Sequence, residues 1–184
     1  GAASVDLQGN VSVFARNELR SGAISLRGVS VLGGQNADWR TDWLAGYRYF
    51  DFNELLVIED TILPFSAPFI SGTRLDGVDR FQAKNRFHGG ELAAATRFRC
   101  GRFSGEFIGR VALGNMHEEV SISGTTTSFV PAAGGNSAQT VVVPGALLAQ
   151  SSNSGVFRRD RLTVIPEVSM NLNFQVTKNV SVTG

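Results

Sequence analysis

The sequence predicts an all-β protein, an antiparallel up-and-down meander that forms, or forms part of, a transmembrane β-barrel. Residues 161–175 alternate without a break between apolar and polar side chains, and the connections between predicted strands are short and long in turn. A period of two over that length indicates a strand with one apolar and one polar face. The run exceeds the ~5–6 residues usual in soluble sheets and matches the ~10-residue tilted strands that cross an outer membrane.

The composition agrees with a barrel and excludes several other classes. Charged residues make up 18% of the 184-residue chain, and the mean hydropathy is +0.01, as expected when a polar lumen balances an apolar belt. The net charge is +1 and the basic residues are scattered, which argues against nucleic acid as a partner. No run reaches the ~20 apolar residues of a membrane helix, and the single cysteine cannot form an internal disulfide.

About eight strands are expected, and each is placed from its alternation and from the turn residues beside it. In order they lie near 4–15, 23–32, 39–50, 54–59, 80–98, 103–123, 161–175 and 180–183. Within the fifth strand the polar side chains change parity at Gly89-Gly90, which predicts a β-bulge because one inserted residue swaps the two faces of a strand.

The connections differ in length. Turns are expected at 16–22, 33–36, 51–53, 99–102 and 177–179, and long loops at 60–78 and 124–158. From residue 51 onward the short turns 51–53, 99–102 and 177–179 alternate with the long loops 60–78 and 124–158, as the periplasmic turns and longer outer loops of an outer-membrane barrel do. The uncharged loop 124–158 suits either inward folding or surface display.

Six segments together resemble the planctomycete-type "putative β-barrel porin" family, the seventh to carry that label. The segments are LAGYRYFDFNEL at 44–55, NRFHGGEL at 85–92, VALGNMH at 111–117, GTTT at 124–127, PGALLA at 144–149 and RDRLTVIPE at 159–167. The resemblance implies a porin-like barrel in the bacterial outer membrane, with no catalytic residues to transfer. It also implies a longer chain, so residues 1–184 are expected to form one barrel domain that is incomplete at its ends.

The polar parity of the predicted strands indicates which side chains point into the barrel. Charge inside a membrane-spanning structure must be solvated or paired. The proposed lumen-lining residues are Arg48, Arg86, Glu106, Arg110, Arg161, Glu167, Asn171 and Asn173. In a narrow barrel of ~8 strands they would only pair with one another, whereas in a wider barrel they would line a selective pore.

The expected function is passive passage of small polar solutes through a polar lumen, in contact with the lipid bilayer. No catalytic residue, cofactor or metal is expected, because neither a nucleophile motif nor metal-ligand spacing is present around His88 and His117. The alternatives are a non-conducting barrel that presents its outer loops to a partner, a soluble β-sandwich and, with least support, a membrane hydrolase. Assembly into a homo-oligomer stays open.

Overall fold

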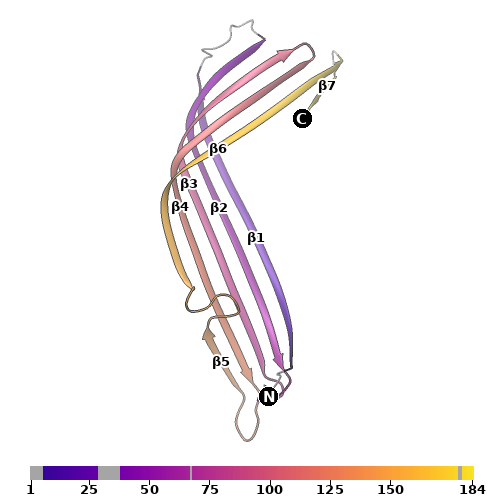
Figure 1. The fold of residues 1–184 in the computed structure, drawn as a ribbon, viewed down its shortest axis with the longest axis vertical. Coiled ribbons are helices and arrows are strands. Elements are labelled where there is room, and N and C mark those ends of the chain that lie inside the picture. The colour runs from indigo at the N-terminus through magenta and orange to yellow at the C-terminus, as the bar shows by residue number, and fades with distance from the viewer. Residues whose placement is uncertain (1–5, 29–37, 67, 178–179) are drawn as a thin grey trace, which may run out of the picture. The chain divides into compact units, whose positions relative to one another are not determined.

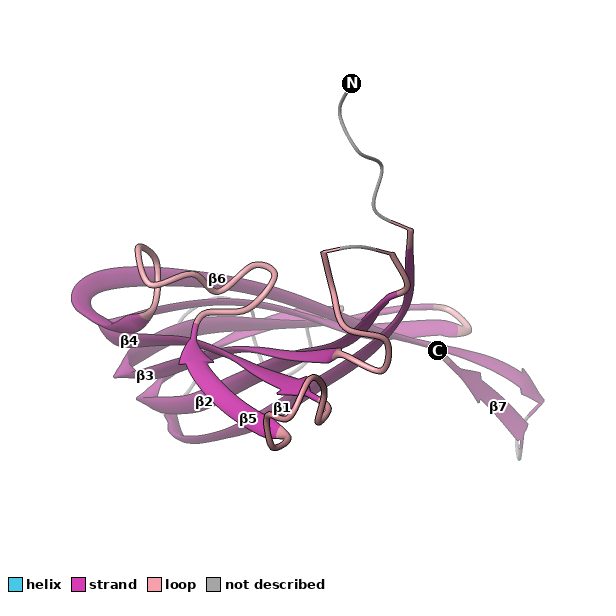
Figure 2. Ribbon diagram, turned by 90° about the horizontal axis from the view of Figure 1, so that it is seen from below, coloured by secondary structure: helices cyan, strands magenta, loops and turns pink. Residues whose placement is uncertain are grey.

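The structure, a computed structural model, describes residues 6–28, 38–66, 68–177 and 180–184. These residues form strands and their connections (Figures 1 and 2), and no helix among them could cross a membrane. The strands are β1 Leu7–Arg27, β2 Trp39–Pro64, β3 Arg74–Cys100, β4 Phe103–Val130, β5 Gln139–Pro144, β6 Gly155–Thr177 and β7 Val180–Thr183. They form one open, antiparallel sheet in the order β1-β2-β3-β4-β6-β7, with β5 also paired to β4. The predicted all-β up-and-down meander is confirmed.

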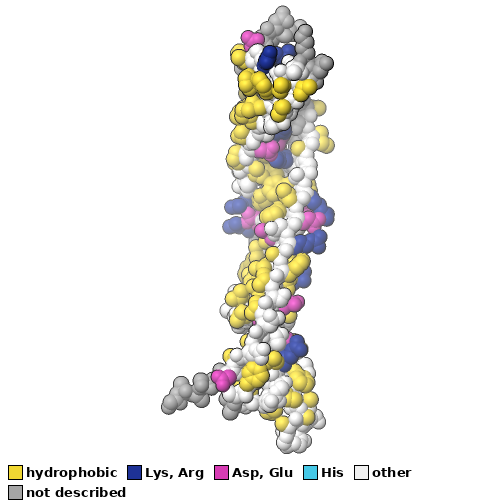
Figure 3. Space-filling model, turned by 90° about the vertical axis from the view of Figure 1, so that its right-hand side faces the viewer, with side chains coloured by type: hydrophobic (Ala, Val, Ile, Leu, Met, Phe, Trp, Pro, Cys, Tyr) yellow, Lys and Arg dark blue, Asp and Glu magenta, His cyan; other side chains and the backbone are white. Residues whose placement is uncertain are grey.

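The alternation that predicted the strand over 161–175 is present in β6. Leu162, Val164 and Val168 on one face are exposed, whereas Thr163 and Ile165 on the other are half-buried. Large apolar side chains are also exposed on β1, β2 and β4. Figure 3 shows hydrophobic side chains on one side of the molecule. So many exposed apolar groups are unusual in a water-soluble domain and indicate a surface that meets an apolar environment.

Up to residue 64 the described strands are longer and fewer than predicted. The turn predicted at 16–22 lies inside β1, and the turn predicted at 51–53 lies inside β2, so both predictions were wrong. Polar residues had indicated turns there, but they occupy ordinary positions in long strands, and no described residue other than glycine has a positive φ. The predicted turn at 33–36 lies outside the described residues.

The β-bulge predicted at Gly89-Gly90 is also not seen. Phe87 and Glu91 are both buried, and the residues between them alternate regularly. Arg97 pairs with Glu106, and Lys84 pairs with Glu119. In each pair the two residues are equally far along the chain from the Gly101-Arg102 turn, so the register of β3 against β4 is the same on both sides of Gly89-Gly90. The sequence changes its polar parity here because β3 carries charge on both faces in turn, not because a residue is inserted.

The connections after β2 differ in part from those predicted. The turn expected within 99–102 is confirmed at Gly101-Arg102, where Gly101 has a φ of 59°. The first long loop is 65–73, shorter than the expected 60–78. The second, expected as 124–158, instead contains the end of β4, the whole of β5 and the connections 131–138 and 145–154. Alternation in β4 continues past the stretch of Gly, Ser and Thr that had indicated a loop.

The chain divides into two compact units, and each long strand contributes residues to both. Unit 1 consists of Gly1–Leu19, Phe52–Asn85 and Glu118–Arg159, and unit 2 of Arg20–Asp51, Arg86–His117 and Asp160–Gly184. The small core of unit 2 joins buried Phe87, Ala112 and Met116 to Phe50 and Ile165, with the Phe50 and Phe87 rings stacked 5.4 Å apart. In unit 1, Asp79, Ala146 and Ala149 are buried.

Replacement of Gly89 by alanine is expected to lower the free energy of unfolding by about 1–3 kcal/mol. A Cβ there would lie 2.3 Å from the Leu113 carbonyl oxygen and 2.5 Å from the Gly114 Cα, both backbone atoms. Gly90→Ala is the matched control, because a Cβ at Gly90 meets nothing within 4 Å. Urea unfolding from lipid vesicles measures both; equal effects would contradict the close strand approach.

Candidate functional site: the polar face of unit 2

One face of unit 2 carries charged and amide side chains from five strands. On this face the strands contribute alternate residues, as the period of two requires. The polar members are Ser25 and Arg27 of β1, Arg40, Asp42 and Arg48 of β2, Glu91 and Arg97 of β3, Glu106 and Arg110 of β4, and Glu167, Asn171 and Asn173 of β6. Hydrogen bonds and ion pairs join most of them into two networks.

The first network is centred on Glu91, whose side chain is 2% exposed. Glu91 Oε2 lies 3.3 Å from Arg48 Nη1, and Oε1 lies 3.2 Å from Arg110 Nη1. The Ser25 hydroxyl donates to Oε1 at 3.3 Å. Glu167 closes the network, because it contacts Arg48 and lies 3.9 Å from Arg110 Nε. Two arginines and two glutamates make it neutral.

Burial explains why the Glu91 carboxylate has so many donors. A charge removed from water is tolerated only when opposite charges and hydrogen bonds replace its solvation. Arg48 and Arg110 come from the strands on either side of β3, so pairing with both also ties the register of β2, β3 and β4 together. The first network therefore stabilises the register of these three strands and also forms part of the polar face of unit 2.

The second network surrounds Asp42, whose side chain is also 2% exposed. Asp42 accepts from Arg40 Nε at 2.8 Å and lies 3.2 Å from Arg27 Nε and 3.3 Å from Arg97 Nη2. Arg27 and Arg97 also bind Glu106 Oε1, at 3.0 and 3.1 Å. Three arginines against two carboxylates give the second network a net charge of +1.

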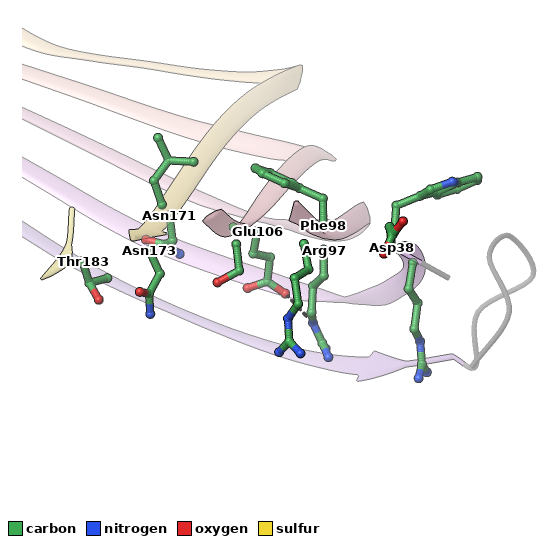
Figure 4. A pocket seen from close by; sticks show the side chains of 13 residues that line it. Asp38, Arg97, Phe98, Glu106, Asn171, Asn173 and Thr183 are labelled. Atoms are coloured by element: carbon green, nitrogen blue, oxygen red, sulfur yellow. Dashed lines mark hydrogen bonds and ion pairs between the residues drawn. The ribbon is translucent and has the colours of Figure 1, made fainter. Parts of the chain in front are cut away.

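An open cavity of about 440 Å³ lies beside the second network. Its polar lining includes Arg97, Glu106, Asn171 and Asn173. In Figure 4 the side chains of Arg97, Glu106 and Asn173 point to one side of the sheet, and that of Phe98 to the other. This part of the polar face offers hydrogen-bond donors and acceptors to water or to a polar solute.

The structure brings together most of the residues predicted to line a lumen. Arg48, Arg110 and Glu167 belong to the first network and Glu106 to the second, and Asn171 and Asn173 line the cavity. Arg161 is exposed and has the parity of Glu167 on β6. Arg86 does not join them: it is exposed and lies beside buried Phe87, on the opposite face of β3 from Glu91.

Sequence reasoning missed the two central acids of these networks. Asp42 and Glu91 were visible as polar-face residues, but neither was chosen as a lumen-lining residue, and the assumed bulge placed Arg86 on the same face as Glu91. Arg27, Arg40 and Arg97 were missed as well, since nothing in the sequence shows which strands are neighbours at which register. The alternation Ser25, Arg27 against Ile24, Leu26 was the one available signal for β1.

The histidines do not converge with Glu91 on a metal site. His88 and His117 lie on the opposite face of the sheet from Glu91. His117 Nδ1 lies 2.9 Å from Asp160 Oδ1. Asn115 donates to the same oxygen at 3.3 Å. Within the described residues no group of three or more histidine, cysteine, aspartate or glutamate side chains could hold a metal ion.

Comparison with known families agrees with this open sheet of alternating strands. The family model described as "putative beta barrel porin-7 (BBP7)" matches residues 3–184. The chain belongs to this family. The family description implies a membrane-embedded β-barrel, and the antiparallel all-β sheet seen here is consistent with it. A search of curated protein sequences gives no match.

Replacement of Glu91 by glutamine should destabilise this member of the porin family by about 3 kcal/mol, because it leaves two arginines without their buried counter-charge. Arg16→Gln is the control: Arg16 forms an exposed pair with Glu18 at 3.6 Å, and its loss should cost less than ~1 kcal/mol. Urea unfolding of the refolded proteins compares them. Similar losses would show that the first network is no more than a surface ion-pair array.

Proposed function

We propose that the chain forms part of an outer-membrane barrel whose polar face of unit 2 lines a water-filled passage for small polar solutes. One observation carries the proposal: the charged networks occupy one face of the sheet, and the face behind them is apolar. A sheet of this kind is stable across a membrane when the apolar face meets lipid and the charged face meets water or pairs internally.

The apolar face of unit 2 has a defined limit on every long strand. It carries exposed Ile24 and Leu26, Trp43 and Tyr47, Leu92, Phe107 and Leu113, and Val168 and Met170. Following each strand along this face, the first charged, histidine or asparagine residue is Arg20, Asp51, His88, Asn115 and Asp160, in strand order. These five residues are expected to mark the level at which the lipid acyl chains end.

The height of the apolar face fits a bilayer. On β4 the outward residues from Phe103 to Leu113 are all apolar or glycine. At ~3.3 Å per residue and a tilt of ~45°, this stretch spans ~25 Å, the height of the apolar band of outer-membrane barrels. β4 has 28 residues, so the proposal places the remainder of the strand outside the lipid.

The connections suggest an orientation. Among the connections from β2 to β6, the two-residue turn Gly101-Arg102 belongs to unit 2, whereas the longer connections 65–73, 131–138 and 145–154 belong to unit 1. Outer-membrane barrels have short periplasmic turns and longer outer loops. We therefore assign the Gly101-Arg102 turn to the periplasmic end.

The charge of the lining suggests weak preference for anions. The first network is neutral and the second has one excess positive charge, beside the cavity with Asn171 and Asn173. Arginine-rich linings favour anions. Because nearly all the charge is paired, discrimination should be modest, and neutral polar solutes should also pass.

Replacement of Val168 by arginine is expected to cost ~2–4 kcal/mol near the bilayer midplane. Val168 is 67% exposed on the proposed lipid face, and an arginine there would have no water or partner. Asn171→Arg is the matched control, since Asn171 lines the polar cavity. Unfolding from vesicles measures both changes; equal tolerance would contradict the assignment of the two faces.

Replacement of Glu106 by glutamine should raise the preference for anions about twofold, because Arg27 and Arg97 lose a counter-charge beside the passage. The measurement is the reversal potential across a planar bilayer in a salt gradient, after folding has been checked by a gel shift on boiling. Glu18→Gln, the same chemical change at the Arg16 pair, is the control and should leave the potential unchanged. A folded wild type without conductance would favour the alternative of a closed barrel.

A further inference from the structure

Arg86 is the predicted lumen residue that lies on the apolar face of unit 2, opposite the charged networks. It is exposed, and it forms no ion pair with any residue that the structure describes. By contrast, the arginines of both networks each bind at least one carboxylate. The guanidinium N–H groups of Arg86 are therefore available to an anion from outside the chain.

On β2, the residue opposite Arg86 is Asp51. The Thr41 and Thr96 hydroxyls lie 2.9 Å apart across β2 and β3, which fixes the register of these strands. Counting along both antiparallel strands from this pair brings Asp51 level with Arg86 on the same face. Asp51 does not reach Arg86, because no described carboxylate oxygen lies within 4.0 Å of the Arg86 guanidinium.

On β4, the residue opposite Arg86 is His117, which is already bonded to an acid. A Cβ at Gly89 would lie 2.5 Å from the Gly114 Cα, so these residues face each other across β3 and β4. The same register brings His117 level with Arg86. His117 Nδ1 lies 2.9 Å from Asp160 Oδ1, so this acid is engaged by His117 and does not neutralise Arg86.

The layer of side chains on this face has a gap beside Arg86. On β3, a Cβ at Gly90 would meet nothing within 4 Å. The registers above place Tyr47 of β2 and Leu113 of β4 on either side of Gly90, and both side chains are exposed. Because Tyr47 and Leu113 project from the sheet and Gly90 does not, the gap between them, here called the Gly90 notch, is lined by apolar groups. An acyl chain is the apolar group that a membrane offers to such a notch.

His88 and Tyr49 lie between the Gly90 notch and Arg86. His88 is exposed on the same face of β3, and Tyr49 is level with it on β2. Imidazole and phenol groups can donate hydrogen bonds to ester and phosphate oxygens, and tyrosine is enriched where lipid headgroups meet water. Along this face the side chains thus change from apolar to hydrogen-bonding to cationic, which is the order that suits a phospholipid from acyl chain to headgroup.

We propose that Arg86, His88, Tyr49 and the Gly90 notch form a binding site for one phospholipid molecule on the apolar face of unit 2, with the phosphate on Arg86 and an acyl chain in the notch. The inference rests on the proposed function, because it requires the apolar face to meet lipid. Guanidinium groups bind phosphate oxygens through paired, charge-assisted hydrogen bonds. The site therefore recognises the phosphate, and phospholipids that differ only in the head alcohol should bind alike.

Lipid binding is measured by native mass spectrometry on the full chain refolded in dodecyl maltoside micelles. Phosphatidylglycerol is compared with a monoglucosyl diacylglycerol that has the same acyl chains and no phosphate. The wild type should bind phosphatidylglycerol about tenfold more tightly, which is the ratio expected from a hydrogen bond to a charged group. Arg86→Gln should abolish the difference between the two lipids.

Arg80→Gln is the matched control. Arg80 is also exposed, has the same parity as Arg86 on β3 and forms no ion pair with a described residue, but Gln82 and Lys84 separate it from Arg86 on this face. Its replacement removes the same charge and should leave the preference for phosphatidylglycerol unchanged. Arg86→Gln should also leave single-channel conductance unchanged, because Arg86 lies on the other face of the sheet from the charged networks.

Gly90→Leu and a soluble competitor test the contribution of the acyl chain. Leucine would fill the Gly90 notch, and phosphatidylglycerol should bind about tenfold more weakly, as expected when about two methylene groups lose their contact. Glycerol 3-phosphate has the phosphate without acyl chains, and at millimolar concentration it should not displace the lipid.

The outcomes distinguish the lipid site from the function beneath it. Loss of the phosphate preference in Arg86→Gln but not in Arg80→Gln, with weaker binding in Gly90→Leu, supports the site. Equal affinity of the wild type for both lipids overturns it, as does a preference that survives Arg86→Gln. Unchanged affinity in Gly90→Leu overturns the placement of the acyl chain, and displacement by glycerol 3-phosphate overturns the lipid in favour of free phosphate.

Conductance of the wild type in a planar bilayer tests the proposed function separately. A chain that inserts and conducts but gives any of these contrary binding results keeps its proposed function and loses the lipid site. A chain that stays soluble without detergent, or that inserts and does not conduct, overturns the proposed function whatever its lipid binding.

Discussion

The pairing of buried carboxylates with arginines from neighbouring strands is the interaction on which the polar face of unit 2 depends. Glu91 and Asp42 are almost without exposed surface, and each is contacted by arginines of at least two strands. Because an unpaired buried charge is far more costly than a paired one, these contacts disfavour any shift of register that would separate the partners. The sheet has only a small apolar core, so its order on this face comes largely from polar pairing.

Close contact between strands is the second constraint, and it comes from glycine. Gly89 and Gly114 face each other across β3 and β4, where side chains would meet backbone atoms of the opposite strand. Their positions beside Phe87 and Met116 let large side chains occupy the space nearby. The same device recurs at Gly124, where the absence of a side chain admits the connection 145–154. Small residues in one strand thus decide what can lie on the sheet.

The two units differ in how they satisfy buried polar groups. In unit 2 the partners are long side chains, arginine with carboxylate, and an open cavity lies beside them at Asn171 and Asn173. In unit 1 the buried Asp79 is satisfied by backbone N–H groups of a loop, which bring the main chain against the sheet. Both arrangements follow from the need to satisfy buried charge.

The sequence by itself determined the class of the protein and the two faces of its strands. Alternation depends only on neighbouring residues, so the apolar parity of β6 and the polar parity of Arg48, Arg110 and Glu167 could be read directly. Only the tertiary structure decided where strands continue, because polar residues at 51–53 resemble a turn until a neighbouring strand is present. It also decided that Arg86 lies apart, that Glu91 is central and that 145–154 folds onto the sheet. Each of these depends on register between distant segments, which no local pattern encodes.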